Sequence, residues 1–238
     1  MPPAPPAGGA AADHAPALAA LFDERVVVAA AIPSLEPGRL YREEVEHVAK
    51  AVPARRAEFL TARVLARQAL ERLGFEPTAL APNPDRSPRW PGGAVGSISH
   101  TAGLCAVAVA KAPEIVGLGL DLEPATALDG DLEDMVCTAR EQADLERLEP
   151  AARGLAAKLI FCAKEAFYKC QHPLAGLELD FTDLAVTLDP GGGRFAVDSL
   201  REDVRGLLRS HRLEARFRIS GSYLLAGATL YLGPLRRD

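Results

Sequence analysis

The chain has 238 residues, of which 48% are hydrophobic and 25% are charged, so it can form one large domain or two small ones around a packed core. Its net charge of −5 argues against a nucleic-acid-binding protein, which usually carries a basic surplus. No stretch approaches the roughly 20 apolar residues of a membrane span, and the proline-interrupted N-terminus lacks the basic start of a signal peptide. We therefore expect a cytoplasmic protein that does not associate with membranes.

The first half of the sequence predicts one strand, two helices and a proline-rich connection. Residues 1 to about 14 are rich in Pro, Ala and Gly, so we expect them to be mobile. The apolar run at 25–32 predicts a buried strand, and the charged run at 39–50 predicts a helix. The clearest helix is predicted over 54–73, where apolar residues recur at steps of three and four before a glycine. Prolines exclude a helix from the connection that follows, as far as Pro91.

The second half mixes strands and helices without strict alternation, which predicts an α+β fold. The expected elements are two short strands within 94–110, a strand over 115–123, helices over 138–148 and 152–170, and late strands at 183–188 and 212–231.

Two carboxylates lie close together in the segment GLGLDLE (117–123). Side chains alternate along a strand, so Asp121 and Glu123 share one face and lie roughly 7 Å apart at the backbone. We expect Gly117 and Gly119 on this same face, where they leave room for a bulky ligand, and Val116, Leu118, Leu120 and Leu122 on the core face. Such oxygen ligands suit Mg²⁺ bound beside a phosphate. An ordinary solvated strand face is the alternative.

A third carboxylate lies in the segment FCAKEAFYK (161–169). Glu165 and Lys169 are four residues apart and so share a helix face, which alone predicts no more than a surface ion pair worth a few tenths of a kcal/mol. The aromatic residues around these charges favour a partly buried site instead.

Basic and polar residues precede these carboxylates. Arg55 and Arg63 are eight residues apart on the predicted 54–73 helix and lie on one side of it, where their forked donors could bind phosphate. Arg86 lies in the proline-rich connection, from which it could reach a ligand. His100, in the turn GSISHT (96–101), could bind a phosphate or transfer a proton. Solvated or purely structural positions remain the alternatives for each.

Other common sites are not supported. The sequence has no Walker loop, no GxGxxG motif and no GxSxG elbow. Its four cysteines form neither a CxxC pair nor another metal-type spacing, so we expect free thiols.

Four segments together resemble the 4′-phosphopantetheinyl transferase superfamily, in particular its long single-chain members that serve siderophore, non-ribosomal peptide and polyketide synthesis. The segments are RRAEFLTAR (55–63), PRWPGGAVGSISH (88–100), GLGLDLE (117–123) and FCAKEAFYK (161–169). Each is weak alone, but they occur in the order and with the separations of that family. Leu122 and Ala166 depart from the residues that the family more often has, and the chain after about residue 180 is not matched.

The resemblance implies two similar α+β halves, 1–116 and 117–238, related by a pseudo-twofold axis, with coenzyme A in the cleft between them. It implies transfer of 4′-phosphopantetheine from coenzyme A to a serine of an apo carrier protein, the reaction of a holo-[acyl-carrier-protein] synthase. The carrier could be an acyl, peptidyl or aryl carrier protein, and a chain with both halves should act as a monomer.

The resemblance also assigns residues. Asp121, Glu123 and Glu165 would bind Mg²⁺, although the ligand types do not distinguish it from Mn²⁺. Glu165 would be the base, directly or through water, and Lys169 would stabilise the leaving group. The residues expected to contact coenzyme A are Arg55, Arg63, Arg86, Ser99, His100 and Lys169. A non-catalytic binding module and a Mg²⁺-dependent nucleotide phosphohydrolase are the alternatives; the presence of all three carboxylates counts against the former.

Overall fold

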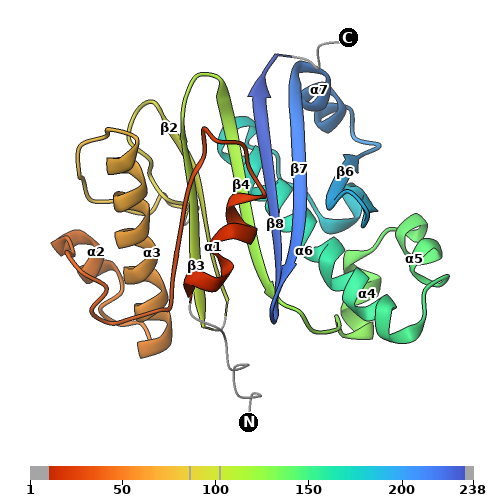
Figure 1. Ribbon diagram of the computed structural model, residues 1–238. Coiled ribbons are helices and arrows are strands. Elements are labelled where there is room, and N and C mark those ends of the chain that lie inside the picture. Colours follow the sequence, from red (N-terminus) through yellow and green to blue (C-terminus); the bar gives the residue numbers. More distant parts are fainter. Residues whose placement is uncertain (1–10, 86, 102, 234–238) are drawn as a thin grey trace.

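A computed structural model describes residues 11–85, 87–101 and 103–233 (Figure 1). Its helices are α1 (Ala11–Ala19), α2 (Arg42–His47), α3 (Pro53–Arg72), α4 (Gly130–Val136), α5 (Ala139–Leu145), α6 (Pro150–Ala175) and α7 (Glu202–Ser210), with a short 3₁₀ helix η1 (Phe181–Asp183). Its strands are β1 (Val27–Ala31), β2 (Ala94–Thr101), β3 (Leu104–Lys111), β4 (Ile115–Pro124), β5 (Ala185–Asp189), β6 (Arg194–Asp198), β7 (His211–Ser220) and β8 (Tyr223–Leu232). The α+β class is thereby confirmed. None of the helices in these residues is long and apolar enough to cross a membrane.

The strands form two antiparallel sheets that meet side by side. The smaller sheet has the order β1-β3-β2, and the larger has the order β4-β8-β7-β6-β5. At the seam, Ser97 and Ser99 of β2 accept hydrogen bonds from the backbone N–H groups of Leu120 (2.9 Å) and Leu122 (3.2 Å) of β4. Serine side chains therefore join the two sheets where backbone pairing stops.

One long helix covers each sheet on the same side of the molecule (Figure 1). Apolar residues of α3, such as Ala66 and Ala69, pack on Cys105 and Val107 of β3. Residues of α6 pack likewise on the larger sheet, with Ala166 in the same cluster as Ala226 and Ala228 of β8. Each helix begins with proline at its first position, where the missing N–H removes no helical hydrogen bond.

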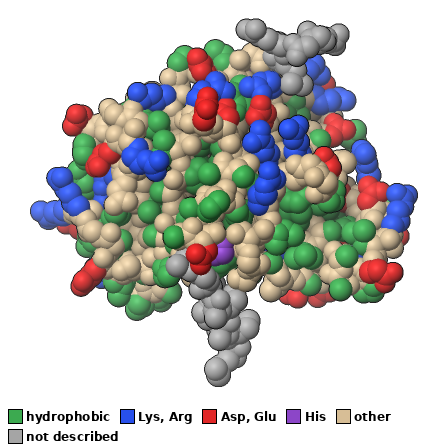
Figure 2. Space-filling model, in the orientation of Figure 1, with side chains coloured by type: hydrophobic (Ala, Val, Ile, Leu, Met, Phe, Trp, Pro, Cys, Tyr) green, Lys and Arg blue, Asp and Glu red, His purple; other side chains and the backbone are tan. Residues whose placement is uncertain are grey.

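The opposite side carries α1, which lies across both sheets (Figure 1). Leu18 of α1 and the neighbouring Phe22 belong to one buried cluster with Ala106 of β3, Leu120 of β4 and Leu225 of β8. Both sheets therefore share a core beneath α1. Figure 2 shows this face, where acidic side chains are interspersed among the basic ones.

The two glycines of β4 have a different role from the one we predicted. A Cβ atom on Gly119 would collide with the carbonyl oxygen of Ala166, and one on Gly117 would come within 2.5 Å of the carbonyl oxygen of Cys170. The backbone of α6, not a ligand, fills the space that these glycines leave. The prediction that Val116 shares a face with Leu118, Leu120 and Leu122 is also wrong. The register shifts between Ile115 and Gly117, so Val116 packs into the α6-side cluster.

Some elements were missed by the sequence patterns. The prediction that residues 1 to about 14 are mobile is wrong from Ala11 onward, because helix α1 begins there. Residues 1–10 lie outside the described part of the chain. The short helices α4 and α7 and the strand β6 were also not predicted. The pseudo-twofold relation of the halves and the division after residue 116 stay predictions.

Candidate active site

A cavity of about 930 Å³ lies on the α3 and α6 side, between those helices, β2, β4 and the connection before β2. It brings together every described residue that the sequence nominated: Arg55, Arg63, Ser99, His100, Asp121, Glu123, Glu165 and Lys169. Arg86 lies outside the described residues. Both predicted halves line this one cavity, so neither forms it alone.

Asp121 lies at the seam between the sheets, and its two carboxylate oxygens have different surroundings. Its side chain is buried, and Oδ1 accepts hydrogen bonds from Lys169 Nζ at 2.6 Å and Ser99 Oγ at 3.1 Å. Within the part of the chain that the structure describes, the buried Oδ2 has no hydrogen-bond partner. An ionised oxygen in this condition is costly to bury, so the geometry favours a ligand that would satisfy it.

The other two carboxylates differ in their partners. Glu123 forms an ion pair with Lys158, at 2.6 Å between Oε2 and Nζ. For Glu165, no hydrogen bond or ion pair to the carboxylate occurs among the described residues. Burial raises the pKa of Glu165, and the nearby charges of Asp121 and Glu123 raise it further, although Lys169 opposes them. Burial is likewise the main reason that the pKa of Glu123 is raised.

These carboxylates do not form a ready-made metal cage. Within the described residues, no three His, Cys, Asp or Glu side chains are gathered so that they could hold an ion. The donor set still fits a hard cation, because Asp121 Oδ2 has no hydrogen-bond partner among the described residues and the charge of Asp121 raises the pKa of both Glu123 and Glu165. Binding would require Glu123 to leave Lys158.

Arg63 provides an unpaired cation elsewhere in the cavity. Its side chain is only 4% exposed, its Nε donates to the carbonyl of Leu80 at 2.7 Å, and its guanidinium lies 4.2 Å from the centre of the Phe59 ring. Burial lowers the pKa of Arg63 to about 10; the charge of Glu44 opposes this shift, and the charges of Arg55 and Arg67 add to it. The side chain nevertheless stays charged at neutral pH, and the described residues record no ion pair for it.

Arg67, one turn further along α3, is equally buried but pairs with the carboxylate of Glu44 and with the carbonyl of Arg39. Arg67 is therefore satisfied within the fold, whereas Arg63 has charge left for an anion.

His100 and Arg55 lie beside Arg63 at the same end. Nε2 of His100 contacts the guanidinium of Arg55, and Nδ1 lies 3.3 Å from the Glu58 carboxylate. Burial lowers the pKa of His100, and Arg55 and Lys169 lower it further, whereas the Glu58 carboxylate raises it. A neutral ring positioned by Glu58 can present Nε2 to Arg55 as an acceptor.

Two lysines of α6 were not singled out from the sequence. Lys158 contacts Glu123, as described above. Lys164, inside the FCAKEAFYK segment, is buried and donates to the Val136 carbonyl (2.8 Å), the Glu141 carboxylate (2.7 Å) and the Phe181 carbonyl (2.9 Å). Its helical position, next to Glu165, gave no signal for this role, since the partners lie in segments distant along the chain.

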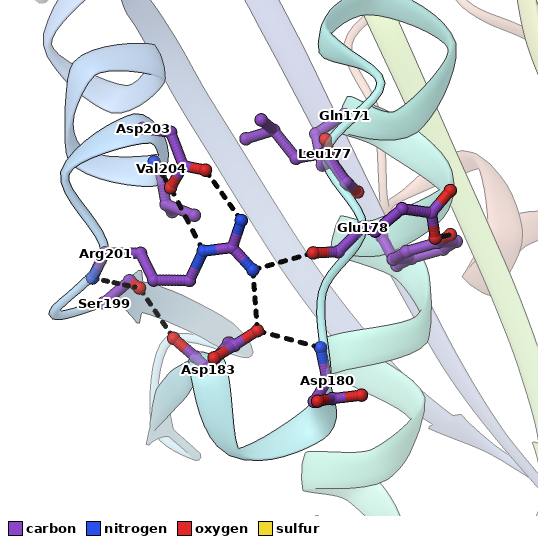
Figure 3. Close-up of polar contacts among 10 residues, drawn as sticks. Gln171, Leu177, Glu178, Asp180, Asp183, Ser199, Arg201, Asp203 and Val204 are labelled. Carbon is purple, nitrogen blue, oxygen red and sulfur yellow. Dashed lines mark hydrogen bonds and ion pairs between the residues drawn. The ribbon is translucent and has the colours of Figure 1, made fainter.

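The rim of the cavity near the end of α6 is held by Glu178. Its carboxylate accepts hydrogen bonds from Tyr168 and His172, each at 3.1 Å. Figure 3 shows how Arg201 fixes the same segment by donating to the Glu178 carbonyl (2.7 Å) and to Asp183 (2.8 Å). The residues after 180, unassigned from the sequence, thus support one wall of the site.

Comparison with known proteins decides the family. A 4′-phosphopantetheinyl transferase N-terminal domain matches residues 43–110, and the 4′-phosphopantetheinyl transferase superfamily domain matches residues 117–226. The chain belongs to the 4′-phosphopantetheinyl transferase superfamily. The first two sequence segments that suggested this family lie in the first match and the other two in the second.

The sequence is similar to three proteins named as 4′-phosphopantetheinyl transferases. It is 43% identical to Svp of Streptomyces mobaraensis over 164 residues, which cover 66% of this chain and 64% of Svp. It is 37% identical to PptT of Mycobacterium tuberculosis, covering 62% of this chain and 64% of PptT, and 37% identical to Npt of Nocardia iowensis, covering 63% and 70%. The chain therefore spans slightly less than two thirds of the length of the first two relatives.

Solved structures of holo-acyl-carrier-protein synthases are also similar. The synthase of Bacillus anthracis, in complex with CoA (3′,5′-ADP), has 21% identity and a TM-score of 0.41, covering 51% of this chain and all of the synthase. The Thermotoga maritima synthase has 18% identity and a TM-score of 0.39, covering 50% and 64%. The family assignment rests on the sequence matches.

Proposed function

We propose that this phosphopantetheinyl transferase moves the 4′-phosphopantetheine arm of coenzyme A to a serine hydroxyl of an apo carrier protein, and releases adenosine 3′,5′-bisphosphate. The observation that carries the proposal is that one cavity of the described structure contains both a cationic side chain and carboxylate oxygens that lack partners. Among the described residues, Arg63 offers a buried cation without an ion pair, whereas Asp121 Oδ2 and Glu165 offer carboxylate oxygens without hydrogen-bond partners. A ligand with phosphates along its length and a bound divalent cation complements both.

The residues divide by position. We assign Arg55, Arg63 and His100 to the phosphate and adenosine end of coenzyme A, together with Arg86 from the connection before β2. Ser99 lines the cavity between the ends, and its hydroxyl also contacts Asp121 and Lys169. We assign Asp121, Glu123 and Glu165 to Mg²⁺, which when bound would neutralise charge on the pyrophosphate.

The reaction joins the serine Oγ to the phosphorus that carries pantetheine and breaks the bond between this phosphorus and the bridging oxygen. Glu165 accepts the serine proton, directly or through a water molecule, and burial raises the pKa of this carboxyl above its ordinary value, which makes it a stronger base. Lys169 is placed to stabilise the charge that develops on the leaving adenosine 3′,5′-bisphosphate. No nucleophile from the chain itself is needed.

Mass spectrometry of an apo carrier protein incubated with the chain, coenzyme A and Mg²⁺ tests the proposal. Acyl, peptidyl and aryl carriers are compared side by side, with Mn²⁺ and EDTA in parallel reactions and Glu165→Gln as the inactive control. A mass gain of one phosphopantetheine on the carrier serine is the expected result. Cleavage of coenzyme A without a carrier would instead indicate a phosphohydrolase, and binding without transfer would indicate a non-catalytic module.

Preference for the acyl carrier would support a holo-[acyl-carrier-protein] synthase, whereas transfer to all three would support a broader transferase. Since both halves line the cavity within one chain, we also propose that the active form is a monomer, which light scattering during the same experiment measures.

A further inference from the structure

Lys158 of α6 holds one of the three proposed metal ligands and has no role in the chemistry above. Its ammonium lies 2.6 Å from Glu123 Oε2, and both side chains are mostly buried, 17% and 21% exposed. The same ammonium lies 5.1 Å from the centre of the Phe161 ring, which lines the cavity. The lysine therefore has two favourable contacts, and only one of them involves Glu123.

The three carboxylates are unequal in their readiness for a cation. Among the described residues, Asp121 Oδ2 has no hydrogen-bond partner although Lys169 contacts Oδ1, and the Glu165 carboxylate has no direct partner. Asp121 is paired with Lys169, which has a role in the proposed reaction. Glu123 is paired with Lys158, which has none. An incoming divalent ion would have to displace this lysine before Glu123 could ligate.

We propose that Lys158 competes with the divalent cation for Glu123 and thereby sets the concentration at which the metal binds. The inference rests on the proposed function, because it requires Glu123 to be a metal ligand. When the metal ion displaces Lys158 from Glu123, the ammonium keeps its contact with the face of the Phe161 ring. Its charge is therefore not left buried without a favourable contact.

The competition predicts that removal of the ammonium tightens metal binding. Mn²⁺ is titrated into the full chain at saturating coenzyme A, with free Mn²⁺ read by electron paramagnetic resonance and a protein-free blank subtracted. In Lys158→Met, the Kd for Mn²⁺ should fall about fivefold, the effect of one partly buried ion pair. Lys158→Arg should retain the parent Kd. Lys111→Met is the matched control, since Lys111 also lies over a phenylalanine ring, that of Phe75, but outside the cavity lining.

Glu123→Gln provides the second test. In this background, Lys158→Met should no longer change the Kd, because the group for which lysine and metal compete is neutral. Lys158→Gln replaces Lys158→Met if the methionine variant does not fold, as judged by circular dichroism.

An unchanged or higher Kd for Mn²⁺ in Lys158→Met would overturn the inference while leaving the metal site intact. Weaker binding of coenzyme A without metal in that variant would also overturn it, because Lys158 would then be a phosphate contact. If the parent binds no Mn²⁺ under any condition, the metal assignment itself falls and the inference falls with it.

Discussion

Arg63 and Arg67 allow a direct test of which buried charge serves the fold and which serves a ligand. Both lie on α3, one turn apart, and both are buried, but in the described part of the chain only Arg67 has an ion pair, with Glu44. We predict opposite consequences when each is replaced by methionine, which keeps much of the side-chain length and removes the charge.

For Arg63→Met, we expect coenzyme A binding to weaken by about 10- to 100-fold. Charged hydrogen bonds contribute roughly 1.5–3 kcal/mol each, and 1.4 kcal/mol corresponds to a tenfold change in Kd. Folding stability should change little. The Leu80 carbonyl loses its donor, which costs stability, but a desolvated guanidinium that forms no ion pair among the described residues is removed, which offsets that cost.

For Arg67→Met, the loss falls on stability. Glu44 would be left fully buried without its cation, and breaking such a pair costs about 3–5 kcal/mol. In a chain of this size each kcal/mol shifts the melting temperature by roughly 2–4 °C, so the melting temperature should fall by about 10 °C. At a temperature where the variant is folded, its affinity for coenzyme A should stay near that of the parent.

Isothermal titration calorimetry with coenzyme A and thermal melts followed by circular dichroism measure both variants. Equal losses of affinity in the two variants, or a collapse of stability in Arg63→Met, would refute the reasoning. Either result would mean that the guanidinium of Arg63 serves the fold as that of Arg67 does.

Three further predictions follow from the packing around the site. Glu165→Gln should abolish transfer yet raise the melting temperature by a few degrees at about pH 7.5. The pKa of Glu165 is higher in the folded state than in the unfolded state, so the stability of the parent falls as the pH rises from the unfolded pKa through the folded one. Near pH 4, where the carboxyl is largely protonated in both states, the variant should show no gain in melting temperature. Gly119→Ala should destabilise the chain by about 3 kcal/mol in urea unfolding, because its Cβ meets the Ala166 carbonyl, whereas Gly130→Ala meets nothing within 4 Å and should change stability by less than about 1 kcal/mol. Ser97→Ala and Ser99→Ala should each cost about 1–2 kcal/mol by orphaning a β4 N–H, but only Ser99→Ala should lower kcat in the carrier assay, and a matching drop in Ser97→Ala would contradict the assigned role of Ser99.

Periodicity was enough to place most residues of the site on the correct elements, but not to bring them together. Alternation along β4 correctly put Asp121 and Glu123 on one face, and the helical spacing correctly paired Glu165 with Lys169 on α6. Their convergence with Arg63 depends on how the two sheets meet, which local spacing does not encode. The family resemblance supplied this, because the order of its segments carries information on the whole fold.

The failures have local causes. The register shift near Gly117 defeated alternation at Val116, and the role of the β4 glycines depends on the approach of α6, which a strand pattern cannot reveal. The difference between Arg63 and Arg67 depends on Glu44, a residue of α2 that carries no motif. Lys158 was passed over for the same reason, since its partner Glu123 lies on another element.

The seam between the sheets explains why the chemistry is placed there. Ser99 Oγ contacts three groups at once: it accepts the Leu122 N–H of β4, donates to Asp121 and lies 3.3 Å from Lys169 Nζ of α6. One hydroxyl from β2 therefore positions a carboxylate of β4 and an ammonium of α6. A shift of β2 relative to β4 would change the contacts of Asp121 directly, because its Oδ1 accepts hydrogen bonds from Ser99 of β2 and Lys169 of α6. A ligand that bridges Arg63 and Asp121 then stabilises the same arrangement that it needs for binding, so occupancy and alignment of the site should rise together.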